Sequence, residues 1–382
     1  MRELIIDLDA IASNLDRMRQ VAAGAKVCGV VKANAYGHGM VAVAKRLEAE
    51  GVDYLGVADL TEALTLRAAG IRTPILAWLH SHDEDFHAGI AAEIDLGLST
   101  TGQLQRAVAA AKTAGKVARI HIKVDTGLGR NGVTLDQLPA LLTLARAAQD
   151  AGDAEVVGIF SHLSCTSREA DLAQIARFEE ALAAAAEAGI NPTLRHLTAS
   201  DGTLSYPQAH YDMVRIGVAL YGLSPYQDHA SADYGLTPAM TATAKVVQVK
   251  QVGAGEGVSY GYLYRTPTET NLALVPVGYA EGLPRLATGG ASVWVNGSLF
   301  GIDSRIAMDQ FVLDVGAHAV APGDTAVLFG DPVKGYPSAD QLAIAAQTIN
   351  YEIVTRMGGR FRRVYLAADE RMTEARAAGV GE

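Results

Sequence analysis

The stretch Arg119–Asp125 reads RIHIKVD, in which apolar and polar side chains alternate. A period of two is the pattern of a β-strand, whose successive side chains point to opposite faces of the sheet. With the apolar side chains facing a helix layer, His121, Lys123 and Asp125 face the other way. In a closed barrel that face is the lumen, which branched apolar residues usually fill. Two explanations stay open: a bound polar ligand, or an internal salt-bridge cluster that satisfies itself.

Similar β-rich runs precede and follow this strand, and Ala- and Leu-rich helical segments separate several of them. Strands that alternate with helices predict a parallel (β/α)8 barrel more readily than an open sheet. We assign this barrel to residues 11–236. Its predicted strands are Val27–Ala33, Tyr54–Ala58, Pro74–Trp78, Ile94–Leu98, Arg119–Thr126, Glu155–Leu163, Leu194–Ser200 and Met213–Leu220.

Two of the intervening segments carry apolar side chains at intervals of three and four residues, the spacing of one helix face. Gly152 and Gly189 follow these segments and are placed to end the helices. The two predicted stripes are Leu138, Leu141, Leu142 and Ala145, and Leu172, Ile175, Phe178 and Leu182.

The pattern changes after residue 236, where short β-rich runs alternate with Gly, Pro and Asn. Asn296-Gly297 between two such runs is a strong hairpin signal. We therefore predict a compact all-β domain over residues 237–382, to which residues 1–10 add a strand at Leu4–Ile6. The charged tail from Asp369 is expected to form a short helix or a frayed end. The predicted strands are Thr241–Val252, Asn271–Gly278, Val293–Val295, Phe311–Val315 and Ala326–Phe329.

Composition narrows the possible classes of function. The formal net charge of −10 argues against a nucleic-acid partner, because phosphates require a basic surface. Neither a signal peptide nor an apolar run long enough to cross a membrane is evident, so a cytoplasmic protein is expected. The two cysteines, Cys28 and Cys165, are far apart in sequence and are predicted to be buried, reduced thiols.

Lys32 stands at the end of the first predicted barrel strand, in the stretch VVKANAYGHG (Val30–Gly39). Burying an ammonium group is unfavourable unless it loses its charge or finds a partner. Covalent attachment to an aldehyde cofactor removes that charge and makes the lysine useful. The alternative is a lysine whose head group reaches water at the barrel rim, and these residues alone leave both explanations open.

The same stretch resembles the cofactor-lysine signature of the alanine racemases. The resemblance continues, in order, through blocks that cover almost the whole chain, and on this basis the chain is identified as a member of that family. The family implies a pyridoxal 5′-phosphate cofactor and an isomerase that interconverts L- and D-alanine. The further blocks are DTGLGR (Asp125–Arg130), SHL (Ser161–Leu163), MVRIGVALYG (Met213–Gly222), GVSYG (Gly257–Gly261), RIAMDQ (Arg305–Gln310) and NYE (Asn350–Glu352).

By this resemblance, Lys32 holds the cofactor and serves as one base, and Tyr260 serves as the other. Racemisation needs bases on opposite faces of the α-carbon, so one lysine is not enough. In the family the tyrosine comes from the partner subunit, which implies a homodimer. A free tyrosine has a pKa of about 10, so its phenolate costs roughly 4 kcal/mol at neutral pH unless neighbouring cations stabilise it.

Arg215 has the largest influence on the implied chemistry, because it matches the residue that donates to the pyridine nitrogen. Arginine keeps its protons and cannot accept, so the nitrogen has to stay unprotonated. The ring is then a weaker electron sink, which favours racemisation over transamination. His196 is implied to orient Arg215. The other implied contacts are Tyr36, Ser200, Tyr351 and the Gly217 and Val218 amides for phosphate; His162 for the ring; Arg130 for the phenolic oxygen and the substrate carboxylate; Met308 and Asp309 from the partner for substrate; and Tyr262, Tyr279 and Arg285 for the access corridor.

Lys123 occupies the position at which the family often carries a carbamylated lysine, beside Arg130. An unmodified lysine there would place two like charges together, whereas a carbamate turns the pair into an attraction. Pairing between Lys123 and Asp125 is the alternative.

Four other functions are alternatives to alanine racemisation. Within the family, a racemase of broader specificity or a serine racemase is the nearest rival. A decarboxylase on the same barrel disagrees with the Arg215 and Tyr260 blocks, and a non-catalytic cofactor-binding barrel would lack the second domain. A metal-dependent hydrolase needs clustered His and carboxylate ligands, and no metal is expected here although His121, His162 and His196 lie on predicted strands. One departure from the family pattern is Ala199 before Ser200, where an Asn-Ser pair is usual.

Overall fold

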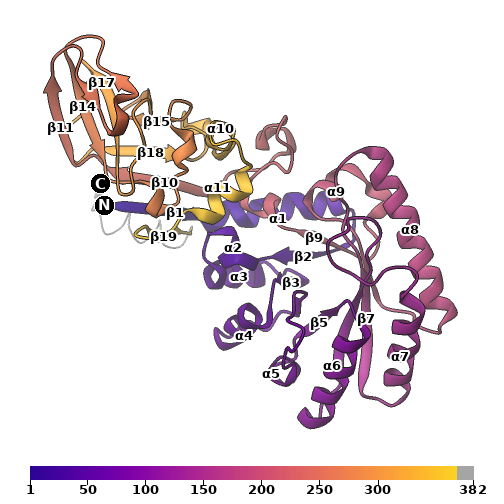
Figure 1. Ribbon diagram of the computed structural model, residues 1–382. Coiled ribbons are helices and arrows are strands. Elements are labelled where there is room, and N and C mark those ends of the chain that lie inside the picture. Colours follow the sequence, from indigo (N-terminus) through magenta and orange to yellow (C-terminus); the bar gives the residue numbers. More distant parts are fainter. Residues whose placement is uncertain (368–382) are drawn as a thin grey trace, which may run out of the picture. The chain divides into compact units, whose positions relative to one another are not determined.

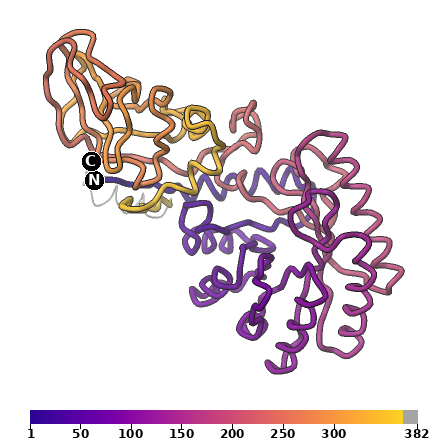
Figure 2. The backbone as a smooth tube through the Cα atoms, viewed as in Figure 1, coloured from indigo at the N-terminus to yellow at the C-terminus, as the bar shows by residue number. Residues whose placement is uncertain are grey.

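The computed structural model describes residues 1–367, so the predicted tail from Asp369 lies outside the described residues. The chain forms two compact units. One consists of Leu15–Ala33 and Met40–Leu220, and the other of Met1–Asn14, Asn34–Gly39 and the described residues from Tyr221 to 367. Figures 1 and 2 show the chain path as a ribbon and as a tube. The predicted boundary at residue 236 stays a prediction.

The first unit is the predicted parallel barrel. Its eight-stranded sheet has the order β8-β7-β6-β5-β4-β3-β2-β9, in which all pairs are parallel. The amides of Asp212 and Arg215 also donate to the carbonyls of Arg195 and Thr198, at 3.0 Å each, so the ring of strands is nearly closed. The strands are β2 (Lys26–Val30), β3 (Tyr54–Val57), β4 (Ile75–Ala77), β5 (Asp95–Leu98), β6 (Ala118–Lys123), β7 (Ala154–Phe160), β8 (Leu194–His196) and β9 (Met213–Ile216).

Several observed strands end earlier than predicted, because their last residues bend into the loops at the carboxyl ends of the barrel. β2 ends at Val30, and a separate turn labelled α2 covers Lys32–Tyr36. β9 ends at Ile216, and the 3-10 turn η2 covers Val218–Tyr221. β6 ends at Lys123. Asp125 therefore does not point into the lumen as predicted, but accepts hydrogen bonds from the amides of Gly127 and Gly129 at 3.0 and 3.1 Å.

Helices lie outside the strands, as Figure 1 shows for α4 to α8. The stripe predicted in α7 is buried, and Gly152 and Gly189 both adopt the positive φ expected after a helix. The helices that contribute residues to this unit are α1 (Leu8–Ala22), α3 (Met40–Ala49), α4 (Leu60–Ala68), α5 (His87–Ala91), α6 (Thr101–Ala114), α7 (Leu138–Asp150), α8 (Arg168–Glu187) and α9 (Ser200–Ser205).

The stripe predicted for α8 is confirmed only in part: Phe178 is buried, Ile175 and Leu182 are half-buried, and Leu172 is wrong. Leu172 is 40% exposed, and the buried face instead includes Asp171 and Gln174. Asp171 accepts from the Cys165 amide at 3.0 Å, and Gln174 accepts from the Ser164 amide at 2.8 Å. These polar side chains are buried because they satisfy the backbone of the loop after β7. The same loop exposes Cys165, which corrects the prediction that both thiols are buried; Cys28 is buried.

The second unit is built on β-sheets, and two short helices, α10 (Ala339–Ala345) and α11 (Asn350–Arg356), add to the predicted strands. A six-stranded sheet has the order β16-β15-β18-β10-β1-β19, and smaller sheets have the orders β11-β14-β17 and β12-β13. The strands are β1 (Arg2–Asp7), β10 (Met240–Lys245), β11 (Gln248–Val252), β12 (Gly257–Val258), β13 (Tyr264–Arg265), β14 (Thr270–Val275), β15 (Ser292–Val295), β16 (Ser298–Gly301), β17 (Phe311–Gly316), β18 (Thr325–Phe329) and β19 (Arg362–Leu366).

Two predictions for this unit are confirmed and one is corrected. β1 lies between β10 and β19, as expected for an N-terminal strand that joins the C-terminal domain. Asn296 and Gly297 have φ values of 47° and 88° and connect β15 to β16, which is the two-residue hairpin predicted. The run predicted as one strand over Thr241–Val252 is two strands, β10 and β11, which belong to different sheets.

Gly158 in β7 provides the space that one lumen side chain occupies. A Cβ atom at this position would lie 2.2 Å from Nδ1 of His121, which is fully buried. We expect Gly158→Ala to lower the free energy of unfolding by about 1–3 kcal/mol, because the lumen has to shift to accept the methyl group. Urea denaturation measures this change. Gly102→Ala in α6 is the matched control: its Cβ would meet nothing nearer than 3.6 Å, so equal destabilisation of both variants would contradict the argument.

Candidate active site

Four cationic side chains gather at the carboxyl ends of the barrel strands. Lys32 follows β2, Lys123 ends β6, Arg130 lies in the loop after β6, and Arg215 is on β9. Their charges act on one another, since Arg130 and Arg215 both lower the pKa of Lys32 and of Lys123. A concentration of positive charge at this face of a barrel, where active sites occur, indicates a site for an anionic ligand.

Arg215 is buried and tightly held. Its Nη2 donates to the carbonyl oxygens of Ser161 at 2.7 Å and Leu197 at 2.9 Å, and it also lies 3.2 Å from Nδ1 of His162. Its Nη1 donates to Nδ1 of His196 at 3.0 Å. Burial lowers the pKa of Arg215 to about 10, which still leaves the guanidinium charged at neutral pH. The site therefore contains a fixed donor that cannot accept a proton.

His162 and His196 are held as neutral rings. Burial, followed by the charge of Arg215, lowers the pKa of His162 to about 2. The same causes, in the same order, hold the pKa of His196 well below its usual value. The ring of Phe160 stacks on His196 with centroids 4.7 Å apart, and the Arg215 guanidinium lies 5.4 Å from the Phe160 centroid. The predicted link between His196 and Arg215 is thus present as a direct hydrogen bond.

Burial and neighbouring positive charges lower the pKa of both lysines at the barrel mouth. Burial is the largest cause of the lowered pKa of Lys32, and Arg130 and Arg215 add to it. Burial and then Arg215 lower the pKa of Lys123 to about 8. An uncharged amine is the form that attacks a carbonyl carbon. Lys123 Nζ lies 5.6 Å from the Phe160 ring centroid, and no ion pair joins Lys123 to Asp125 among residues 1–367.

Ser200, Gly217 and Val218 come together after the last two barrel strands. The Ser200 hydroxyl accepts from the amide of Gly217 at 3.1 Å and, over a longer 3.4 Å, from the amide of Ala219. Ser200 begins α9, and Val218 begins η2. In barrels of this type, the loops after the last strands are the usual place for a phosphate group. That these groups bind a phosphate stays a prediction.

The residues after Lys32 adopt a rare conformation. Ala33, Asn34, Ala35 and Tyr36 have φ values of 52°, 54°, 54° and 51°, so α2 is a left-handed turn. Left-handed conformation costs L residues roughly 1–2 kcal/mol each. Nδ1 of the buried His38 lies 3.0 Å from both the Ala35 and the Tyr36 carbonyl oxygens, and donates to them to hold the turn. Strain retained in this way is typical of functional sites.

Tyr36 and Tyr351 meet in the second unit. Their ring centroids are 6.1 Å apart, and the ring of Tyr221 lies 4.9 Å from that of Tyr36. Gly37 has a φ of 84°, and a Cβ atom there would lie 2.3 Å from the carbonyl oxygen of Val354 in α11. Only glycine fits this approach, which keeps the turn with Tyr36 against the helix that carries Tyr351.

The predicted second base, Tyr260, is at the surface of the second unit. Its exposed fraction is 71%, and that of Met308 is 53%. Asp309 accepts from Arg360 Nη2 at 2.7 Å. The contact that these residues are predicted to make with a barrel site of another subunit stays a prediction. Of the predicted corridor residues, Tyr262 and Tyr279 are also exposed, at 58% and 42%.

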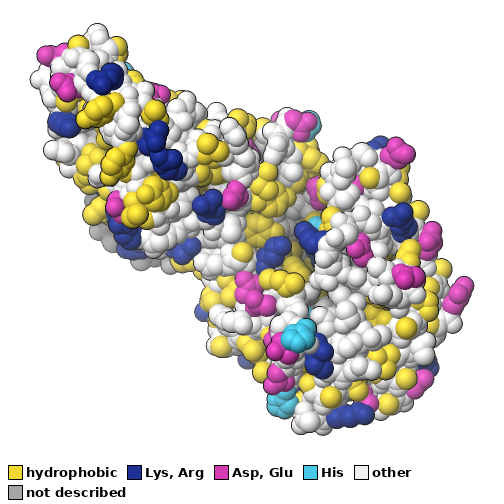
Figure 3. Space-filling view, in the orientation of Figure 1, with side chains coloured by type: hydrophobic (Ala, Val, Ile, Leu, Met, Phe, Trp, Pro, Cys, Tyr) yellow, Lys and Arg dark blue, Asp and Glu magenta, His cyan; other side chains and the backbone are white. Residues whose placement is uncertain are grey.

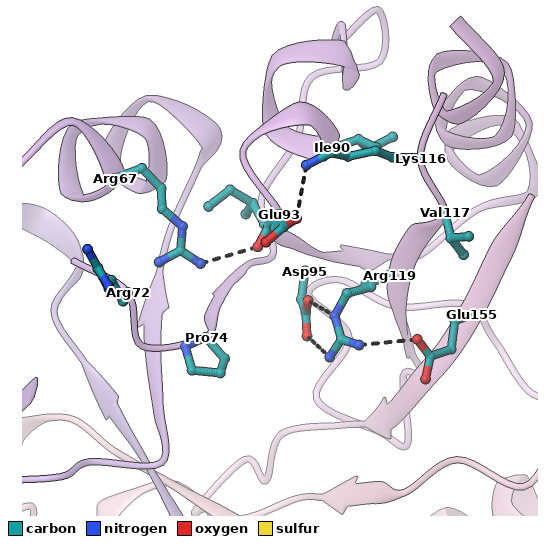
Figure 4. A pocket seen from close by; sticks show the side chains of 11 residues that line it. Arg67, Arg72, Pro74, Ile90, Glu93, Asp95, Lys116, Val117, Arg119 and Glu155 are labelled. Carbon is teal, nitrogen blue, oxygen red and sulfur yellow. Dashed lines mark hydrogen bonds and ion pairs between the residues drawn. The ribbon is translucent and has the colours of Figure 1, made fainter. Parts of the chain in front are cut away.

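The barrel also contains polar residues that sequence reasoning did not single out. A cavity of about 460 Å³ opens at the amino ends of the strands, and Asp95, Arg119 and Glu155 are among its lining residues (Figure 4). Arg119 Nε donates to Asp95 at 2.7 Å, and Arg119 Nη1 to Glu155 at 3.1 Å. A charged residue at the start of the apolar stretch DLGL (Asp95–Leu98) was the available signal.

Models of known protein families match both parts of this chain. The model of the alanine racemase N-terminal domain matches residues 6–225, and that of the alanine racemase C-terminal domain matches residues 239–365. The chain belongs to the alanine racemase family.

Individual relatives of the family cover the chain almost completely. An alanine racemase of Salinispora arenicola is 49% identical over 359 residues, which are 93% of this chain and 95% of the relative. One from Thermobifida fusca is 49% identical over 370 residues, or 96% and 98% of the two chains. The crystal structure of alanine racemase from D-cycloserine-producing Streptomyces lavendulae is 45% identical, with a TM-score of 0.95 over 97% of this chain and 98% of that one.

Membership in the alanine racemase family decides between fold-level alternatives. The family match extends over both units, which a lone cofactor-binding barrel would not give. Alanine racemases are isomerases, and pyridoxal phosphate is the cofactor that the family implies. Within residues 1–367 no group of His, Cys, Asp and Glu side chains is placed to hold a metal ion, and no helix is long and apolar enough to cross a membrane.

Proposed function

We propose that the protein is a pyridoxal-phosphate-dependent alanine racemase that interconverts L- and D-alanine as a homodimer, with Lys32 and Tyr260 as the two bases. The observation that supports this most strongly lies at one barrel mouth, where a half-buried Lys32 shares the site with the fixed guanidinium of Arg215. Burial and the charges of Arg130 and Arg215 lower the pKa of this lysine. Relatives over 40% identical along nearly the whole chain bear the name alanine racemase. A cytoplasmic location is part of the same proposal.

The donor set at the barrel mouth fits pyridoxal phosphate. Lys32 would supply the amine for its aldehyde, Arg215 would donate to its ring nitrogen, and the Ser200 region with the Gly217 and Val218 amides would hold its phosphate. The family resemblance implies two further phosphate contacts, Tyr36 and Tyr351, whose rings lie 6.1 Å apart in the second unit. When bound, the cofactor withdraws electrons from the α-carbon of an attached amino acid and so acidifies its α-proton.

Each residue then has a defined task. Arg215 keeps its proton, so a ring nitrogen bound to it would have to accept, and the bound ring would withdraw electrons less strongly than a protonated one. His162 is neutral and does not compete with Arg215 as a cation. Lys32 Nζ, as a neutral amine, takes the α-proton on one face, and the Tyr260 hydroxyl returns a proton on the other. Inversion requires that these two groups stand on opposite sides of the α-carbon.

A second copy of the chain is the proposed source of Tyr260 for each site. Figure 3 shows hydrophobic side chains at the surface of the second unit. Tyr260, Tyr262 and Leu263 are 71%, 58% and 58% exposed, and Met308 is 53% exposed. Exposed aromatic and apolar side chains that cluster in this way are typical of a protein interface. The proposed homodimer covers them and supplies Met308 and Asp309 to the substrate together with Tyr260.

Racemisation of amino acids by the purified protein tests this function directly. Circular dichroism is expected to show loss of optical activity with L-alanine when pyridoxal phosphate is present. L-serine and L-lysine, measured in parallel, distinguish a racemase of broader specificity, which would convert them at a comparable rate. Absence of conversion with all three amino acids contradicts the proposal.

Carbamylation of Lys123 is a further expectation. Carbon dioxide reacts with a neutral amine, and the pKa of about 8 makes that form accessible near neutral pH. As the pH rises through 8, the ammonium fraction falls, so carbamylation is expected to increase with pH. Carbon-13 bicarbonate should then give a carbamate NMR signal in the wild type that Lys123→Met lacks. The carbamate would also stabilise the charge of Arg130, because it replaces a like charge beside the guanidinium with an opposite one.

The control for this experiment is Lys26→Met, which removes an exposed lysine at the other end of the barrel. It should leave the carbamate signal unchanged. A signal that persists in Lys123→Met, or that is missing from the wild type at pH above 8, would show that Lys123 remains an amine.

A further inference from the structure

A continuous row of buried hydrogen bonds runs through the barrel lumen. Arg215 Nη1 is 3.0 Å from His196 Nδ1, and His196 Nε2 is 2.9 Å from His121 Nδ1. His121 Nε2 is in turn 3.2 Å from Asp95 Oδ2. Both histidine rings are fully buried, and Asp95 is 2% exposed. The row starts at the barrel mouth and ends at the first residue of β5, at the amino ends of the strands.

The chemistry of its two ends fixes the direction of every bond in the row. Arginine can only donate, so Nδ1 of His196 has to accept and carries no proton. A neutral imidazole has one donor and one acceptor, and therefore Nε2 of His196 donates to Nδ1 of His121. Nε2 of His121 then carries the proton and donates to Asp95. A charged carboxylate can only accept, so both ends require the same direction.

Asp95 is held as a carboxylate by several donors. Arg119 Nε donates to its Oδ1 at 2.7 Å, and the Tyr54 hydroxyl donates to its Oδ2 at 3.2 Å. Burial raises the pKa of Asp95, but the hydrogen bonds from His121 and Arg119, together with the charge of Arg119, outweigh burial, and the pKa is lowered overall. The acceptor end of the row is therefore charged at neutral pH.

We propose that Asp95 is a positioning residue for Arg215. Asp95 fixes the tautomers of His121 and His196, so that Nδ1 of His196 accepts a hydrogen bond from the Arg215 guanidinium. Asp95 touches neither substrate nor cofactor. The inference rests on the proposed function in one respect only, namely that Arg215 donates to the ring nitrogen of the cofactor. The order of tautomers follows from the hydrogen bonds alone.

A purely structural role for the same residues predicts something different. His196 also stacks on Phe160, and His121 fills the space above Gly158. If packing were their only role, a substitution that preserved shape at Asp95 would change neither the tautomers nor the reaction. Asp95→Asn is such a substitution.

The first test needs no variant. In the cofactor-loaded protein with nitrogen-15-labelled histidine, NMR is expected to show both His121 and His196 neutral at neutral pH, with the proton on Nε2. His121→Gln and His196→Gln variants assign the signals. A proton on Nδ1 of either ring, or a doubly protonated ring, would overturn the proposal.

The second test is Asp95→Asn. The asparagine side chain has a single oxygen, and this oxygen accepts from the charged Arg119. Its NH2 group therefore turns toward His121 and requires Nε2 of His121 to accept. His121 then donates from Nδ1 to His196 Nε2, and the Nδ1–H of His196 faces the N–H of Arg215. Both signals should change to the Nδ1–H form. A buried unpaired donor costs about 1–3 kcal/mol, so kcat is expected to fall about tenfold to a hundredfold, with a smaller change in KM.

Tyr54→Phe is the matched control, since it removes one hydrogen bond to Asp95 and leaves the carboxylate in place. It should keep the wild-type tautomers and alter kcat by less than about twofold. Unchanged tautomers in Asp95→Asn, or an equal loss of kcat in Tyr54→Phe, would overturn the proposal. If Asp95→Asn does not fold, the NMR measurement of the wild-type tautomers alone decides whether the proposal holds. Expected tautomers in a protein without racemase activity would leave this inference standing and reject the proposed function.

Discussion

Lys32→Ala is expected to abolish racemisation and to remove the long-wavelength absorbance of the lysine-bound cofactor. The substitution removes both the attachment point and one of the two bases. General base catalysis alone contributes about 10²–10⁴-fold, and loss of attachment adds to this. Circular dichroism measures turnover, and an absorbance spectrum of the purified protein measures the bound cofactor.

Lys26→Ala is the control for Lys32→Ala. Lys26 and Lys32 flank the same strand, β2, but Lys26 is exposed at its amino end, away from the cations of the site. Its loss should leave spectrum and turnover close to those of the wild type. A Lys32→Ala protein that turns over at a rate near that of the wild type would rule out the assignment of the cofactor lysine.

Tyr260→Phe is expected to lower the rate of racemisation by about 10²–10⁴-fold, because it deletes the proton carrier on one face of the α-carbon. In deuterated water, exchange into the α-position should stop on that face and continue on the face served by Lys32. Proton NMR of recovered L- and D-alanine measures the two exchange rates separately. Since the Tyr260 side chain is 71% exposed in a single chain, its folding should not depend on the hydroxyl.

Tyr262→Phe tests whether the effect belongs to Tyr260. The two tyrosines lie in the same 3-10 turn, η4 (Tyr260–Tyr262), and both are exposed. Tyr262 is implied to line the access corridor, which serves both faces alike, so Tyr262→Phe should leave the ratio of the two exchange rates unchanged. Equal loss of exchange on both faces in Tyr260→Phe would mean that the two bases had been assigned wrongly.

Much of the fold could be predicted because its signals are local. The alternation in Arg119–Asp125, the hairpin at Asn296-Gly297 and the apolar stripe of α7 each depend on a few neighbouring residues. Strand ends were less predictable, as β2 and β9 show. Their predicted ends contain apolar side chains suited to a strand, such as Val31 and Val218, but the backbone turns there.

The errors arose where a polar side chain bonds the backbone of a nearby loop. Asp171 and Gln174 lie on the buried face of α8 because they bond the loop after β7, which an apolar pattern does not register. Asp125 bonds its own loop, although the alternation placed it in the lumen. In both cases a hydrogen bond made the burial or orientation of a polar group favourable.

The sequence by itself determined the family, the order of barrel and sheet units, and the presence of Lys32, Arg215 and Tyr260 in their motifs, since these are written in contiguous residues. Only the tertiary structure decided that Arg215, His196, His121 and Asp95 form one row. Their consecutive partners are 19, 75 and 26 positions apart in the chain, and they come within hydrogen-bond distance because the barrel turns alternate side chains of different strands into one lumen. Local sequence patterns do not indicate which distant strands bring their side chains together in the lumen.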